Sequence, residues 1–547
     1  MAKSVKSAIL GIEIGILVTW LLQLRYEAGI DSLLYHAMAS AVVRNGRAPW
    51  TLNPLSYLGL YPGSDSSSIP FLAADLALVS GIPLDYTIIA YNAILLLTLG
   101  LGLFILIRHL TNRADLAVLA VLLGSLAFGF YTTDQWNLDE RSFNVALTPL
   151  FVYLALPRGR HFSALPDARR GSILGVISLL MATSHLSFLL LLPVLVLVPL
   201  TYGVAIYQFR WRRHRWASGL FFGAVVAAPL ALLFTMSQVG VLAGLKLQYS
   251  LENSAFFSGD SPIIFFLNSF IFIATRAGPV IVVCAAIGLC FLATQRALLE
   301  RPVLIGSLLL AGFLGIPLVL YSKDLLTPIL VVPAIIGIGR LAEKTRKRSS
   351  VLVVAALMVV AGSATFNVWN ASRTSARIDA TYWTERGITP DATNTNLWIA
   401  IQSVESGCVY GNNWLAVRQV SVSPSRFVCG DSDVAFVLRQ AILSPGFAQR
   451  FEVEYVGVFA GQPQNWFRSP MLERVTQDFA RVPQLSFSAG RDLLMGYGVQ
   501  VIIVDLQKPE QVPLYLFEGT TDSRFFRELW QNGWAAYKTS RFAVFYL

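Results

Sequence analysis

The sequence has few charged residues and few cysteines. Charged residues make up 14% of the 547 residues, whereas hydrophobic residues make up 55%. Soluble globular domains carry about 25% charged residues, so the composition excludes an ordinary soluble protein and indicates a membrane protein. The 4 cysteines contain no Cys-x-x-Cys pair and the 5 histidines contain no His-x-His cluster. These absences argue against a structural zinc site.

The sequence also lacks an internal repeat, a low-complexity linker and a small-x-small cleavage site after its first apolar run. The last absence favours a retained first helix over a cleaved signal peptide. The net charge is +10, from 42 basic and 32 acidic residues. The basic residues form short clusters between apolar runs, as the positive-inside rule requires. We therefore expect a multi-pass protein of the cell membrane and no nucleic-acid partner.

Placing every basic cluster on the cytoplasmic side predicts a cytoplasmic N-terminus, an extracytoplasmic C-terminus and membrane-spanning helices in alternating directions. Region 171–208 is also compatible with one long tilted helix instead of two spans that meet near His185. The apolar runs 69–81 and 261–274 are shorter than the roughly 17–20 residues that a crossing needs, so we expect them at the outer membrane interface. The predicted spans, 11 in number, are 7–24, 86–107, 114–130, 142–157, 171–185, 187–208, 217–235, 279–293, 303–320, 325–339 and 351–368.

The composition becomes more polar after residue 368. Short β-rich runs at 453–459 and 499–505 alternate with a helical pattern at 522–534. The sequence thus predicts a polytopic α-helical membrane domain over 1–368 and an extracytoplasmic soluble α/β domain over 369–547. An oxidising exterior permits a disulfide between Cys408 and Cys429.

Ionisable residues gather in the predicted extracytoplasmic loops. Asp31 follows the first span and is suited to act as a general base, although it is also a plausible N-cap of the amphipathic segment that it begins. Asp139 and Glu140 are adjacent carboxylates that repel each other unless a cation or a proton intervenes, and Mg²⁺ and Mn²⁺ prefer such oxygen ligands. Arg141 can bind phosphate oxygens as a bidentate fork. Further candidates for substrate or phosphate binding are His36, His185, Arg276 and Lys323.

Three motifs resemble the GT-C superfamily of membrane glycosyltransferases. They are Asp31 with Tyr35–His36 and the Gly46–Trp50 ending, the YPGS stretch at 61–64, and the acidic loop with Asp134, Asp139 and Glu140. The stretches GCVYGNNW (407–414) and LWQNGW (529–534) are similar to the tail domains of archaeal and bacterial members.

This resemblance implies inverting transfer of a sugar from a polyprenyl- or dolichyl-phosphate-linked donor to a glycan, lipid or protein acceptor. It also implies Asp31 as the base, and Asp139 and Glu140 as residues that hold a divalent cation or the acceptor. Oligosaccharyltransferases carry a WWDYG motif that is absent here, where the comparable stretch 409–416 contains no acid. The absence disfavours the glycosylation of asparagine sequons.

Two other functions remain open from the sequence. A transporter or lipid flippase would place its charged groups near the bilayer midplane, often on repeated or broken helices, whereas here the charges gather at one face. A non-catalytic protein that only presents the external domain would not need Asp139, Glu140 and Arg141 between two spans. The sequence therefore favours the glycosyltransferase.

Overall fold

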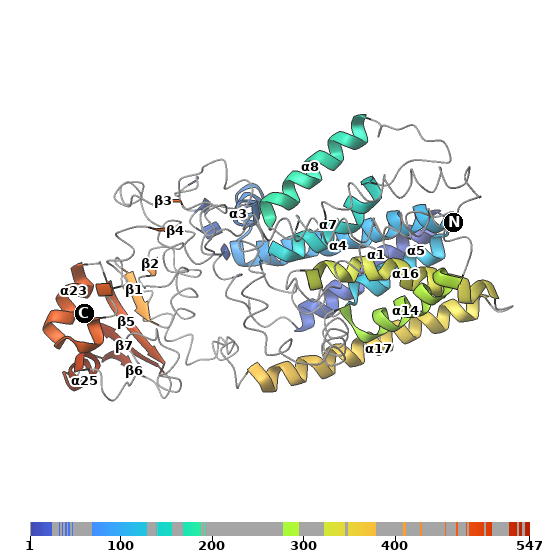
Figure 1. The fold of residues 1–547 in the computed structure, drawn as a ribbon. Helices are drawn as coiled ribbons and strands as arrows, with labels where there is room; N and C mark the ends of the chain where they lie inside the picture. Colours follow the sequence, from blue (N-terminus) through green and yellow to red (C-terminus); the bar gives the residue numbers. More distant parts are fainter. Residues whose placement is uncertain are drawn as a thin grey trace, which may run out of the picture.

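A computed structural model shows a bundle of helices and a separate, smaller sheet domain (Figure 1). It describes residues 2–23, 68–127, 140–155, 168–185, 277–294, 322–344, 348–378, 481–496, 499–505, 524–532, 535–538 and 542–547, together with short pieces at 32, 35–36, 39–40, 42–43, 46, 138, 188, 191, 408–411, 427–428, 454–455, 467–468 and 477–478.

The helices of the bundle coincide with predicted apolar runs. Eight predicted spans and the run 69–81 are helical, and α8 ends at Ser184, so residues 171–208 do not form one continuous helix. The predicted runs 217–235, 261–274 and 303–320 lie outside the described residues, as does the predicted span 187–208 except for residues 188 and 191. The helices are α1 (Ala2–Gln23), α3 (Ser68–Ser80), α4 (Leu84–Thr111), α5 (Ala114–Ser125), α7 (Glu140–Ala155), α8 (Ala168–Ser184), α14 (Pro279–Thr294), α16 (Ser322–Lys344) and α17 (Arg348–Ile378).

The surface of the bundle is apolar on its outward faces. Large apolar side chains are exposed on α8, at Ile173 and Val176, and on α17, at Leu357 and Met358. Several exposed large apolar side chains on one helix are unusual on a soluble monomer and fit contact with lipid. Among the described residues, α4 is the one helix long and apolar enough to cross a bilayer. The number of spans therefore stays a prediction.

Close helix packing holds the bundle together. A Cβ atom on Gly288 of α14 would collide with the backbone carbonyl of Pro333 in α16, and Gly337 of α16 in turn approaches Gly288. Small residues of this kind let two helices approach closely without a hydrophobic driving force from water.

Glu13 is a fully buried acid in α1. Its Oε1 accepts a hydrogen bond of 3.1 Å from the Ser125 hydroxyl of α5, and its carboxyl packs against Gly100 of α4. Glu13 thus faces the interior of the bundle. Its carboxyl joins three helices at a position where an unpartnered acid would be costly.

The second domain is a mixed sheet with strand order β2-β1-β5-β7-β6. β1 pairs in parallel with β2 and β5, whereas β7 pairs antiparallel with β5 and β6. The strand predicted at 499–505 and the helix predicted within 522–534 are both present. The elements are β1 (Cys408–Gly411), β2 (Phe427–Val428), β3 (Glu454–Tyr455), β4 (Phe467–Arg468), η6 (Val482–Gln484), α23 (Phe487–Gly496), β5 (Val499–Asp505), α25 (Arg524–Gln531), β6 (Ala535–Lys538) and β7 (Phe542–Tyr546), and β3 pairs with β4 in a separate two-stranded sheet.

The two domains define a direction along the molecule. Figure 1 shows α3 on the side of the bundle that lies toward the sheet, and the N-terminus on the opposite side. Only three residues separate α3 from α4, so the start of α4 also lies on the side of the sheet. We call this side the sheet end of the bundle and the opposite side the N-terminal end.

Candidate functional site

Polar residues from distant parts of the sequence meet at the sheet end. The hydroxyl of Ser32 accepts a hydrogen bond of 2.8 Å from the backbone N–H of Leu138, and both residues are buried. This bond joins the segment that follows α1 to the residues that precede α7. The regions of the first and second predicted external loops are therefore neighbours in the fold.

His36 is buried beside the first turn of α4. Its side chain is 3% exposed, and its Nε2 lies 3.9 Å from Oδ1 of Asp85, whose side chain is 51% exposed. Asp85 was not among the residues predicted from the sequence, because an acid at the start of an apolar run is a common feature of helix N-termini. The pair brings the segment around residues 32–43 onto α4.

Asn144 joins α7 to the end of α8. Its Nδ2 donates to the carbonyl of His185 at 3.2 Å, and its Oδ1 accepts from the hydroxyl of Ser184 at 2.7 Å. All three residues are buried. His185, which was a candidate from the sequence, is therefore bound to a residue of α7 that lies about one turn after Arg141.

Arg141 lies in the first turn of α7 and its side chain is partly buried. Residues three and four apart share a helix face, so Arg141 lies on the same side of α7 as Asn144. The N-terminus of a helix carries a partial positive charge and favours anions. An arginine at this position adds a full charge, and the combination suits a phosphate group.

We call Ser32, His36, Asp85, Arg141, Asn144, Ser184 and His185 the polar cluster. Of the predicted site residues, the structure thus brings His36, Arg141 and His185 to the sheet end. Asp31, Asp139, Arg276 and Cys429 lie outside the described residues. The side chains of Glu140, Lys323 and Cys408 also lie outside them, although their backbones belong to α7, α16 and β1.

Metal binding by Asp139 and Glu140 therefore stays a prediction. Within the described ranges, no group of three or more histidine, cysteine or acidic residues could hold a metal ion. The disulfide between Cys408 and Cys429 also stays a prediction. Among the cysteines described, Cys284 in α14 is free.

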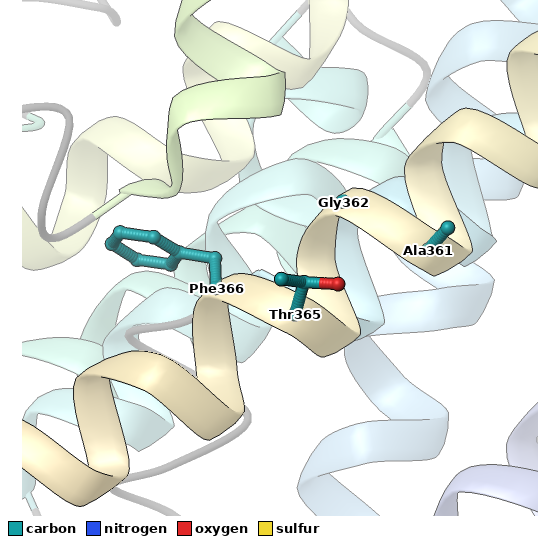
Figure 2. A pocket seen from close by; sticks show the side chains of 4 residues that line it. All are labelled: Ala361, Gly362, Thr365 and Phe366. Carbon is teal, nitrogen blue, oxygen red and sulfur yellow. The ribbon is translucent and has the colours of Figure 1, made fainter.

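A hollow of about 410 Å³ lies elsewhere, on α17. Figure 2 shows the side chains that line it, Ala361, Thr365 and Phe366, with Gly362 between them. A Cβ atom on Gly362 would meet Val280 of α14, so the hollow borders the contact between these two helices. It contains one hydroxyl group and no charged group, so it does not match the chemistry of the polar cluster.

Comparisons with known proteins identify the fold. No family model matches the chain, and no curated protein matches it. Its structure is similar to that of ArnT from Cupriavidus metallidurans bound to undecaprenyl phosphate, with a TM-score of 0.52 and 12% identity over 100% of this chain and 98% of that chain.

The archaeal oligosaccharyltransferase AglB from Archaeoglobus fulgidus, in complex with an inhibitory peptide and a dolichol-phosphate, has a TM-score of 0.49 and 14% identity over 92% of this chain and 69% of that chain. ArnT is a membrane glycosyltransferase of the GT-C superfamily. The chain therefore has a GT-C-like architecture, and the resemblance inferred from its sequence is confirmed for the fold.

Proposed function

We propose that this GT-C-like chain is a membrane glycosyltransferase. It transfers a sugar from a polyprenyl- or dolichyl-phosphate-linked donor to an acceptor at the extracytoplasmic face, with inversion at the anomeric carbon. The observation that carries the proposal is the polar cluster, in which His36, Arg141 and His185 come from separate parts of the sequence to one end of the bundle. Catalytic groups from several loops on a rigid scaffold are typical of enzymes.

The donor phosphate binds at the N-terminus of α7 in this proposal. Arg141 supplies a fixed positive charge and several N–H donors, and His36 and His185 supply further hydrogen bonds. Arg276 and Lys323 are additional candidates from the sequence. The apolar outward faces of the bundle leave the lipid tail in the bilayer while the phosphate stays at the edge of the cluster.

The chemistry needs a base and a leaving group. Asp31 takes the proton from the acceptor hydroxyl as its oxygen attacks the anomeric carbon. The bond between this carbon and the phosphate oxygen breaks, and polyprenyl phosphate leaves with the electron pair. Asp139 and Glu140 hold the acceptor or a divalent cation, and a cation would neutralise the charge that develops on the phosphate.

The proposal includes an orientation for the protein. The N-terminus is cytoplasmic, and the domain at 369–547 is extracytoplasmic, where Cys408 and Cys429 form a disulfide. The alternation of basic clusters along the sequence supports this orientation, as does the position of the sheet and the N-terminus on opposite sides of the bundle (Figure 1).

A turnover assay tests the function. The purified protein in lipid nanodiscs is incubated with undecaprenyl-phosphate-linked hexoses, one at a time, together with a mixture of glycan, lipid and protein acceptors, and the release of undecaprenyl phosphate is measured. We expect release with at least one hexose, and a loss of at least about 10²-fold in Asp31→Asn, the usual contribution of a general base. Asp115→Asn, at the N-terminal end of α5, is the matched control and should retain its turnover.

Two results would contradict the proposal. The absence of release from every hexose donor by the folded protein would favour the transporter or the non-catalytic alternative. Translocation of an intact donor across vesicles would then identify the transporter. Normal release by Asp31→Asn would reject Asp31 as the base and move that role to Asp139 or Glu140.

A further inference from the structure

The side chain of Asn144 is a buried bridge between two helices. It is 0% exposed and uses both ends of its amide, with Nδ2 donating to the carbonyl of His185 and Oδ1 accepting from Ser184. These opposite requirements fix the orientation of the amide, because only its nitrogen can donate and only its oxygen can accept. The last residue of α8 and the residue after it are thus both tied to α7.

The end of α8 has its own internal hydrogen bonds. The hydroxyl of Ser184 also approaches the carbonyl of Met181 at 2.8 Å, and the backbone N–H of His185 donates to the same carbonyl at 3.2 Å. The carbonyl of His185 in turn accepts from the N–H of Phe188 at 3.1 Å. The end of α8 therefore keeps its shape without Asn144, and what Asn144 adds is the link to α7.

The effect of Asn144 on the position of His185 can therefore be separated from its effect on the stability of the protein. Replacing a buried polar group destabilises a protein strongly when its partners are left unsatisfied. Here the Ser184 hydroxyl keeps the carbonyl of Met181 as a partner, and the His185 carbonyl keeps the N–H of Phe188. Leucine branches at the same carbon as asparagine but cannot hydrogen-bond, so at position 144 it would release the end of α8 from α7.

We propose that Asn144 is a positioning residue that fixes His185 relative to Arg141. Arg141 lies one turn earlier on the same face of α7, so the amide of Asn144 ties the backbone of the residue that carries the imidazole to the helix that carries the guanidinium group. Two such groups at a fixed separation form a site for the phosphate of a lipid-linked donor. This use of the bridge rests on the proposed function, whereas the bridge itself does not.

Chemical labelling of His185 tests the bridge without any substrate. The full-length protein is treated with diethyl pyrocarbonate, and the modification rate of each histidine is followed by mass spectrometry. His185 is 3% exposed and should react slowly, whereas the exposed His109 provides the reference rate. In Asn144→Leu, we expect His185 to react about fivefold faster relative to His109, as the loss of one net hydrogen bond predicts.

Thr148→Val is the matched control. Its hydroxyl is buried on the same helix and donates to the backbone carbonyl of Asn144 at 2.7 Å, so the bond that this variant loses lies within α7. This variant should leave the labelling rate of His185 unchanged. An unchanged rate in Asn144→Leu, or an equal increase in Thr148→Val, would overturn the proposed bridge.

Kinetics test the consequence for the donor. We expect Asn144→Leu to raise the KM for the undecaprenyl-phosphate-linked hexose about tenfold with little change in kcat, since small displacements of a binding group are costly. In the His185→Gln background, Asn144→Leu should have no further effect, because the two residues act as one unit. If the two substitutions instead raise the KM independently, so that their effects multiply in the double variant, the positioning role of Asn144 is overturned. A protein whose labelling behaves as expected but which uses no donor would instead refute the proposed function alone.

Discussion

Arg141 is the residue whose charge the proposed donor site depends on most. It lies in the first turn of α7, where the positive end of the helix adds to its own charge. The neighbouring Asn144 keeps His185 close to the same turn. A phosphate at this position would meet donors from both α7 and the end of α8.

Substitution of Arg141 by alanine should weaken the use of the donor. The loss of a hydrogen bond to a charged group costs about 1.5–3 kcal/mol, so the KM for an undecaprenyl-phosphate-linked hexose should rise roughly tenfold to a hundredfold. Arg108→Ala, which removes an exposed positive charge from the C-terminal part of α4, is the matched control. An unchanged KM in Arg141→Ala would place the phosphate elsewhere, with Arg276 as the next candidate.

The sequence identified some residues of the polar cluster and missed others for a physical reason. His36, Arg141 and His185 are ionisable residues near the ends of apolar runs, so they are visible without knowledge of the fold. Asn144 and Ser184 are neutral, and such residues occur throughout apolar helices. Their importance depends on which helices are neighbours, and a single sequence does not contain that information.

At the scale of the element, the helix α23 begins against a carboxylate of another helix. Oε2 of Glu528 in α25 accepts a hydrogen bond of 2.6 Å from the backbone N–H of Phe487, the first residue of α23. Oε1 of Glu528 accepts from Nε of Arg524 at 2.8 Å. The bond from Phe487, together with the Arg524 guanidinium, lowers the pKa of the Glu528 carboxyl from its ordinary value.

This lowered pKa predicts a pH-dependent contribution to the stability of the sheet domain. A carboxyl whose pKa is lower in the folded state stabilises the protein above its unfolded pKa, which is about 4.3, and this contribution is lost as the pH falls through the folded pKa. The wild-type protein should therefore unfold at a higher temperature than Glu528→Gln near pH 7. Thermal unfolding between pH 7 and pH 3 should show this difference shrinking toward zero, and a constant difference would contradict the account.

The sequence predicted most elements but not all of their ends. The strand β5 coincides with the predicted residues 499–505, because five of its seven residues are valine or isoleucine, which favour strands. In contrast, α17 continues through the expected domain boundary at residue 368 to Ile378, since helix propensity has no sharp limit at a change of polarity. The close contact of Gly288 with Gly337 depends on the pairing of α14 with α16, which the sequence does not specify.

At the scale of the whole molecule, the chemistry is concentrated at one end. The polar cluster lies at the sheet end of the bundle, and the N-terminus lies at the other end (Figure 1). The N-terminal end instead contains Arg113, which pairs with Asp115 and Glu343. A bundle with the polar cluster at one end and apolar outward faces is suited to a substrate that has a charged head and a lipid tail.

The most direct test of this account is to find where the head of such a lipid binds. Undecaprenyl phosphate with a photoreactive group next to its phosphate is bound to the full-length protein in nanodiscs, irradiated, and located by mass spectrometry. The account predicts cross-links within residues 32–43, 138–144 and 184–188, which an excess of unmodified undecaprenyl phosphate should suppress. Suppressible cross-links at 108–115 and 340–344, at the N-terminal end, would contradict it.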